Sequence, residues 1–282
     1  MQGFHSRFAF VSLFAMALMP LCLHAQTFAE LPGVRLRYVD TGGKGVPIVL
    51  LHAATGSADV WENQIKPFRD AGYRVIAFDR RGWGQSVTTA GAEPGTAAGD
   101  LQGLMDFLKI DRFHLVGTAA GGFVAFDYAL SFPQRLRSLI VAASIGGVVD
   151  EDFQALGRRM RPPQFAALPP DLRELGPAYR AANAKGTERW LENERASRPP
   201  GPVATAQPLR NQMTLALLET VKTPTLFIAG GADMYAPPPL MQMFAQRIKG
   251  SQLVTVPDAG HSIYWEMPQA FNDAVLRFVR KH

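Results

Sequence analysis

A run of small residues in the middle of the chain constrains the fold more than any other feature. The apolar segment Phe113–Val116 leads into residues 117–122 (Gly-Thr-Ala-Ala-Gly-Gly), and the amphipathic segment 123–130 follows. This order predicts a strand, a very tight turn and a helix in immediate succession. The glycines let the strand and the helix approach closely, and they let the residue between them adopt a strained backbone conformation.

Strand-like and helix-like segments alternate along most of the chain. Residues 34–40 alternate apolar and polar side chains, as a half-buried antiparallel strand does. Several wholly or mostly apolar runs are typical of strands buried on both faces of a parallel sheet. With the intervening helical patterns, they predict an α/β fold with a mostly parallel sheet flanked by helices. The apolar runs are residues 46–51, 73–78, 136–143 and 223–229.

The tight turn at residues 117–122 resembles the nucleophile elbow of the α/β-hydrolase superfamily, Gly-x-Ser-x-Gly. Ala119 stands at the nucleophile position of this motif, and a methyl group cannot attack a carbonyl carbon. Residues 79–86 (Asp-Arg-Arg-Gly-Trp-Gly-Gln-Ser) also resemble a Gly-rich loop of the family. We expect Asp79 and Ser86 to satisfy backbone groups within that loop. The resemblance implies the α/β-hydrolase fold with a helical cap insertion.

Two further motifs follow in the family's order of acid and then histidine. The Gly-x-x-Asp sequence at residues 230–233 matches the acid position, and the Gly-His pair at 260–261 matches the histidine position. The resemblance therefore implies that Asp233 orients His261 and that His261 acts as a base. Asp258 is a rival acid, but it is too near His261 in sequence to reach behind the ring easily.

The resemblance also implies an oxyanion hole. Ala53 follows His52 where the family has a His-Gly turn, and its backbone N–H group can serve because any residue except proline supplies one. The N–H of Ala120, directly after the elbow residue, is the second expected donor. We expect His52 and His114 to pack or hydrogen-bond near strand ends rather than to take part in chemistry.

Ala119 leaves three interpretations open. It is an inactivating Ser→Ala substitution, or it is natural in an enzyme whose His261 activates water or deprotonates the substrate, or the protein is a non-catalytic ligand-binding homologue. The precursor-like amino terminus favours a natural alanine. Thr118 is a reserve nucleophile and Ser144 a weaker one, because the elbow geometry directs residue 119 toward the pocket.

The chain divides into four expected segments. Residues 1–25 combine a positive start, an apolar stretch and a small final residue, which is typical of a secretory signal peptide. Residues 26–147 and 218–282 are expected to form the hydrolase core, and residues 148–217, rich in Pro and Arg, the cap or lid. Cleavage after Ala25 would export the protein to a periplasm or to the exterior, leave it without stable membrane insertion and remove Cys22, its one cysteine.

Composition excludes several classes of function. The formal net charge is +5, but no dense run of Lys and Arg is present, which argues against nucleic-acid binding. We expect no cofactor and no metal, because no cluster of metal-ligating residues is visible and residues 117–122 lack the lysine of a phosphate-binding loop. The sequence thus predicts an exported enzyme that acts on a small, partly apolar organic molecule, such as an ester, a lactone or an activated C–C bond.

Overall fold

The apolar runs form the centre of a nine-stranded sheet with the order β1-β2-β4-β3-β6-β7-β8-β9, and β5 pairs with β2. The computed structural model describes residues 27–198 and 207–282, so the predicted signal peptide lies outside the described residues. Strands β1, β2 and β5 pair antiparallel, and from β4 to β9 all neighbours are parallel. The sequence did not predict β1 or β5. The strands are β1 Thr27–Leu31, β2 Val34–Asp40, β3 Pro47–Leu51, β4 Arg74–Phe78, β5 Val87–Thr88, β6 Phe113–Thr118, β7 Leu136–Ala142, β8 Thr225–Gly230 and β9 Gln252–Val256.

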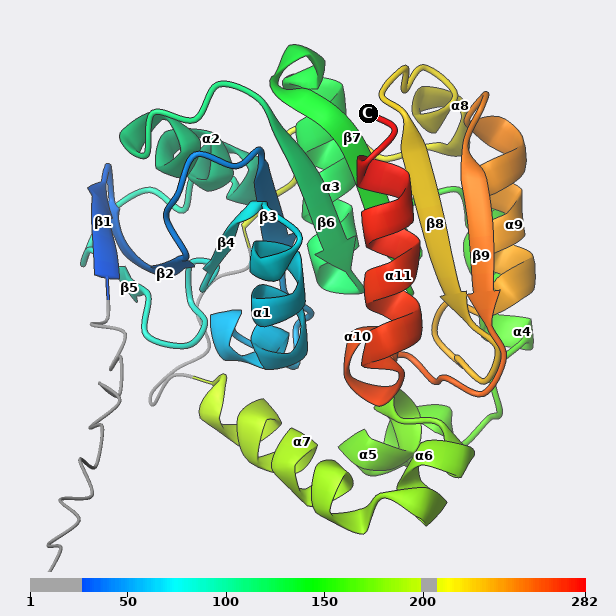
Figure 1. Ribbon diagram of the computed structural model, residues 1–282. Coiled ribbons are helices and arrows are strands. Elements are labelled where there is room, and N and C mark those ends of the chain that lie inside the picture. Colours follow the sequence, from blue (N-terminus) through cyan, green and yellow to red (C-terminus); the bar gives the residue numbers. More distant parts are fainter. Residues whose placement is uncertain (1–26, 199–206) are drawn as a thin grey trace, which may run out of the picture.

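Helices cover both faces of this sheet (Figure 1). Helices α1 and α11 lie on one face, and α2, α3 and α9 lie on the other. This arrangement confirms the predicted α/β fold with a mostly parallel sheet between helices. The flanking helices are α1 Glu62–Asp70, α2 Ala97–Phe107, α3 Ala120–Ser131, α9 Pro238–Arg247, α10 Ile263–Glu266 and α11 Pro268–Val279.

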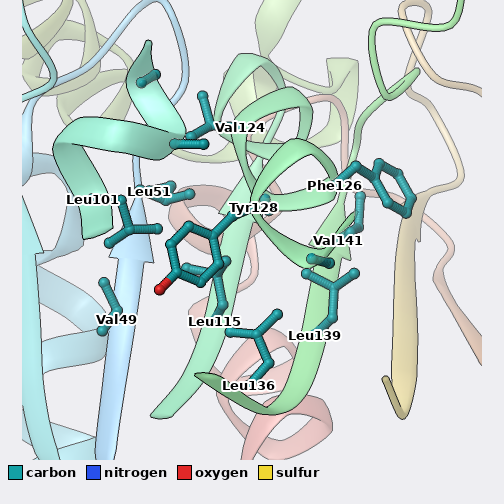
Figure 2. Packing of buried hydrophobic residues seen from close by; sticks show 14 of the residues in the cluster. Val49, Leu51, Leu101, Leu115, Val124, Phe126, Tyr128, Leu136, Leu139 and Val141 are labelled. Carbon is teal, nitrogen blue, oxygen red and sulfur yellow. The ribbon is translucent and has the colours of Figure 1, made fainter. Parts of the chain in front are cut away.

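The strands contribute alternate side chains to two hydrophobic cores. Val49 and Leu51 of β3 pack with the residues of α2 and α3, whereas Ile48 and Leu50 belong to the core under α1 and α11. Figure 2 shows the first of these cores, with side chains of β3, β6 and β7 facing Tyr128 and its neighbours on α3. Each large apolar side chain buried in this way stabilises the fold by about 1.5–3 kcal/mol. The continuous apolar runs are therefore explained by burial on both faces.

A helical segment separates β7 from β8. In Figure 1 its helices α5, α6 and α7 lie at the end of the sheet toward which the arrowheads of β6, β8 and β9 point. Helix α4 instead packs Phe153 against Phe244 of α9. The cap limits at 148 and 217 stay a prediction, and residues 199–206 lie outside the described residues. The helices of this segment are α4 Glu151–Arg159, α5 Pro170–Glu174, α6 Pro177–Ala182, α7 Ala184–Ala196 and α8 Leu215–Leu218.

None of the helices in the described ranges combines the length and the apolarity that a membrane span requires.

Candidate active site

The turn between β6 and α3 holds Ala119 in a strained backbone conformation. Ala119 has φ of 50° and ψ of −118°, a region that residues with a side chain rarely adopt. Its N–H group donates to the carbonyl of Ala142, 3.0 Å away, and its own carbonyl accepts from the N–H of Gly122 at 2.9 Å. The surrounding structure therefore fixes the strained residue from both sides.

Glycine is required beside this turn because the backbone segments approach so closely. A Cβ atom on Gly121 would lie 2.3 Å from the carbonyl oxygen of Leu51, and one on Gly117 would lie 2.5 Å from the carbonyl oxygen of Gly121. Both distances are far below van der Waals contact. The elbow is thus built by the glycines that the sequence analysis singled out.

A cavity of about 680 Å³ lies over this turn. Loops that follow six of the parallel strands line it together with residues of α5, which is where ligands bind in open α/β sheets. The residues that line it include Ala53, Arg80, Ala119, Ala120, Ser144, Glu174, Tyr235 and His261.

The predicted acid and histidine meet at this cavity. The His261 ring nitrogen Nδ1 lies 2.8 Å and 3.0 Å from the two carboxylate oxygens of Asp233, and both side chains are almost completely buried. Asp233 Oδ1 also accepts hydrogen bonds from the N–H groups of Tyr235 and Ala236. The ring of Tyr235 packs on the imidazole, with 4.4 Å between the ring centroids. Asp233 is therefore fixed, and it holds the ring of His261 in one orientation.

Three carboxylates change the protonation of His261. Burial lowers the pKa of His261, but the negative charges of Asp233, Glu174 and Glu266 and the hydrogen bond to Asp233 outweigh it and raise the pKa to about 9. Burial raises the pKa of Glu174 in turn, although the charge of His261 opposes this shift. The imidazolium form of His261 is therefore favoured at neutral pH.

The two expected oxyanion donors also border the cavity. Ala53 follows β3, and Ala120 is the first residue of α3, so its N–H group has no partner within the helix. His52 stabilises the first of these turns, since its Nδ1 lies 2.7 Å from the carbonyl of Ala53 and its Nε2 accepts from the N–H of Arg80. Burial lowers the pKa of His52 well below its usual value, which keeps this ring neutral.

The reserve nucleophiles lack a suitable position. Thr118 is buried at the end of β6 and does not border the cavity. Ser144 borders it, but its hydroxyl donates to the carbonyl of Ala119 at 2.6 Å. Asp258, the rival acid, is exposed at the surface. His114 lies 2.8 Å from the hydroxyl of Ser138, away from the cavity.

Asp79 and Ser86 form the loop contacts expected of them. Asp79 accepts from the N–H groups of Ala58 at 2.7 Å and Gln85 at 2.8 Å. The hydroxyl of Ser86 donates to the carbonyl of Asp79 at 2.6 Å. These bonds fix the loop that follows β4.

Two buried glutamates, Glu174 and Glu266, lie near His261, and the sequence did not predict either of them. The backbone carbonyl of Glu174 accepts from the N–H groups of His261 at 2.8 Å and Ser262 at 3.0 Å. These bonds connect α5 to the loop after β9 that carries His261, the histidine loop. The carboxylate of Glu266 accepts from the N–H groups of Gly176 and Gly260. Both carboxylates are buried, and Oε2 of Glu174 has no hydrogen-bond partner among the described residues. Neither role has a signal in the sequence beyond the closeness of Glu266 to His261.

Within residues 27–198 and 207–282, no group of three or more His, Cys, Asp or Glu side chains is arranged to hold a metal ion.

Comparison with known proteins agrees with this fold. The model of the alpha/beta hydrolase family matches residues 48–274, and the chain belongs to this family. Together with the relatives below, this makes the protein an α/β-hydrolase-fold enzyme of the hydrolase or lyase class.

Two kinds of relatives are similar over most of their length. A 2-hydroxy-6-oxononadienedioate/2-hydroxy-6-oxononatrienedioate hydrolase of Burkholderia vietnamiensis is 31% identical over 270 residues, which cover 88% of this chain and 92% of the relative. The structure of a thermophilic esterase from Thermogutta terrifontis, with malate bound, superposes with a TM-score of 0.75 and is 29% identical, covering 91% of this chain and 97% of the esterase. A hydrolase from Pseudomonas aeruginosa superposes with a TM-score of 0.74 at 26% identity and covers 91% of this chain and 99% of its own.

Proposed function

We propose that this protein hydrolyses a small, partly apolar organic substrate by means of His261, Asp233 and water, without a nucleophile at position 119. The observation that carries this proposal is the fixed Asp233–His261 pair beside a residue that has no hydroxyl. By their names, one relative is a hydrolase of 2-hydroxy-6-oxononadienedioate and 2-hydroxy-6-oxononatrienedioate, and the other is an esterase. Esters, lactones and activated C–C bonds are therefore the substrate classes to test.

The proposed reaction begins with proton transfer to His261. Neutral His261 accepts a proton from a water molecule, and the hydroxide attacks the scissile carbonyl carbon. Asp233 holds the ring and stabilises the imidazolium that forms. The N–H groups of Ala53 and Ala120 stabilise the negative oxygen of the tetrahedral intermediate.

The intermediate then collapses. The bond to the leaving group breaks, and the imidazolium of His261 returns its proton to the departing oxygen or carbon. In an alternative that uses the same residues, His261 takes a proton from the substrate itself. Both routes need a base in the cavity, and neither needs an acyl-enzyme.

Turnover of a substrate panel by the unmodified protein and by His261→Ala tests this proposal. The substitution is expected to lower turnover by about a hundred-fold or more. Calorimetric binding measured beside product detection separates an enzyme from a binding protein. A protein that binds its ligand equally well in both forms and releases no product would contradict the proposal.

The variant Ala119→Ser distinguishes an altered mechanism from a disabled one. A serine at this position restores the family's order of serine, Asp233 and His261. In a water-activating enzyme the added hydroxyl occupies space that water or the substrate needs, so the natural reaction slows or stays level. A gain of esterase activity by about three orders of magnitude or more would instead identify a serine esterase inactivated by substitution.

We also propose that the protein is exported and cleaved after Ala25. The positive start and the apolar stretch of residues 1–25 support this proposal. Amino-terminal sequencing of the protein from the producing cell should find Gln26 first. An intact Met1 on a cytoplasmic protein would overturn it.

A further inference from the structure

Arg80 lies at the cavity on a rigid support. It follows Asp79, whose carboxylate accepts two backbone hydrogen bonds across the loop after β4. Its own N–H group donates to Nε2 of His52 at 3.0 Å, which joins this loop to the turn after β3. The side chain of Arg80 then borders the same cavity as Ala119 and His261. Its backbone is therefore held in place before any ligand binds.

The guanidinium of Arg80 has no counter-charge among the residues that the structure describes. Its nitrogens Nε and Nη2 are buried and have no hydrogen-bond partner among the described residues. The neighbouring Arg81 differs, because it forms a two-pronged ion pair with Asp100 and donates to the carbonyls of Gly33 and Glu93. No carboxylate in the described ranges pairs with Arg80, whose Cζ lies 5.4 Å from the centroid of the Trp83 ring.

Burial of the positive charge of Arg80 destabilises the folded protein. Burial alone lowers the pKa of Arg80 to about 10, and no neighbouring carboxylate raises it again. The group still carries its charge at neutral pH, because that value lies well above 7. A charge that has lost water without gaining a partner destabilises the folded protein. An anion in the cavity would compensate this charge, because Arg80 borders the cavity and its charge is delocalised over the whole guanidinium, so that direct contact with the buried Nε and Nη2 is not required.

We propose that Arg80 binds a carboxylate on the substrate, so that the substrate is an organic acid carrying a hydrolysable bond. This inference rests on the proposed function for the hydrolysable bond, but carboxylate binding by itself does not require turnover. Arg173 borders the same cavity and adds positive charge, whereas Arg198, which also borders it, pairs with Glu194. The mainly apolar remainder of the lining suits a hydrocarbon segment between the carboxylate and the scissile bond.

Calorimetry with non-hydrolysable probes tests the binding part directly. The probes are benzoate, phenylacetate and 3-phenylpropionate, each compared with its uncharged amide. We expect at least one carboxylate to bind the unmodified protein about ten- to a hundred-fold more tightly than its amide. Arg80→Gln should abolish this preference, and Arg80→Lys should keep part of it.

The control is Arg159→Gln, which removes one positive charge from the exposed last turn of α4. It should keep the full preference for carboxylates. Thermal unfolding of each variant establishes that it is folded. The proposal is overturned if no carboxylate binds more tightly than its amide, or if Arg80→Gln keeps the preference while folded.

A kinetic comparison links this binding to the reaction. A p-nitrophenyl ester of succinic acid, which carries a free carboxylate, is compared with p-nitrophenyl butyrate. Arg80→Gln should lower kcat/KM for the charged ester alone, mainly through KM. An equal loss for both esters would contradict the proposal. Absence of all turnover would count against the proposed function and leave the calorimetric result standing.

Discussion

The turn after β6 and the loop after β9 border one cavity, but they differ in what holds them in place. At the first, backbone hydrogen bonds and closely packed glycines fix Ala119 at a strained φ of 50°. At the second, side chains take part as well, because Asp233 holds the ring of His261 and Glu266 holds the loop backbone. Two backbone hydrogen bonds to the carbonyl of Glu174 add to them. A fold can therefore maintain a reactive position through its backbone even where the side chain at that position carries no reactive group.

Substitutions in these two regions should therefore have different effects, one on folding and the other on the reaction. Changes at the glycines of the turn after β6 should act mainly on folding, because these glycines permit the close approach of backbone segments. Changes at the histidine loop should act mainly on rate and on pH dependence.

Asp233→Asn has the largest expected effect. The free base of His261 forms as the pH rises through about 9, so kcat/KM of the unmodified protein should increase across that pH. Loss of the negative charge lowers the pKa of His261 and moves this increase to lower pH. The plateau should fall by about ten- to a hundred-fold or more, since the imidazolium is no longer stabilised. Asp258→Asn, at an exposed residue, is the control. If it changed the pH profile and the plateau of kcat/KM as much as Asp233→Asn does, Asp233 could not be assigned as the acid that orients His261.

Gly121→Ala should destabilise the fold strongly. The added Cβ would meet the carbonyl oxygen of Leu51 at 2.3 Å, and backbone atoms cannot move away cheaply. We expect the free energy of unfolding to fall by about 1–3 kcal/mol in a denaturant titration. Gly103→Ala is a matched control within α2, because its Cβ would lie 3.4 Å from Leu31, in ordinary contact, and should be neutral or slightly stabilising. Equal stability of the two variants would show that the turn is not closely packed.

Glu174→Gln has the smallest expected effect. Its charge raises the pKa of His261 less than that of Asp233 does, so the pH profile should move to lower pH by a smaller amount. Its backbone carbonyl still accepts the N–H of His261, and therefore the loop should keep its position. Glu188→Gln on the exposed side of α7 should leave the pH profile unchanged. If the pH profile of Glu174→Gln also matched that of the unmodified protein, the carboxylate of Glu174 would not raise the pKa of His261.

The sequence predicted those features that depend on local pattern. The apolar run at residues 46–51 predicted strand β3. The glycines around Ala119 predicted a tight turn with close approach of the backbone. Each of these patterns has one structural explanation. The meeting of Asp233 with His261 followed from a family resemblance. Arg80 and Glu174 were missed, since the absence of a partner and the burial of a carboxylate depend on tertiary neighbours that no local pattern specifies.

The central claim is that His261 and Asp233 work without a covalent nucleophile. Intact-protein mass spectrometry of the unmodified protein, mixed with a fluorophosphonate or with a p-nitrophenyl ester that it turns over, tests this most directly. We expect the mass to stay unchanged while product accumulates from the ester. A covalent adduct on Thr118, on Ser144 or on any other serine of the cavity would contradict it.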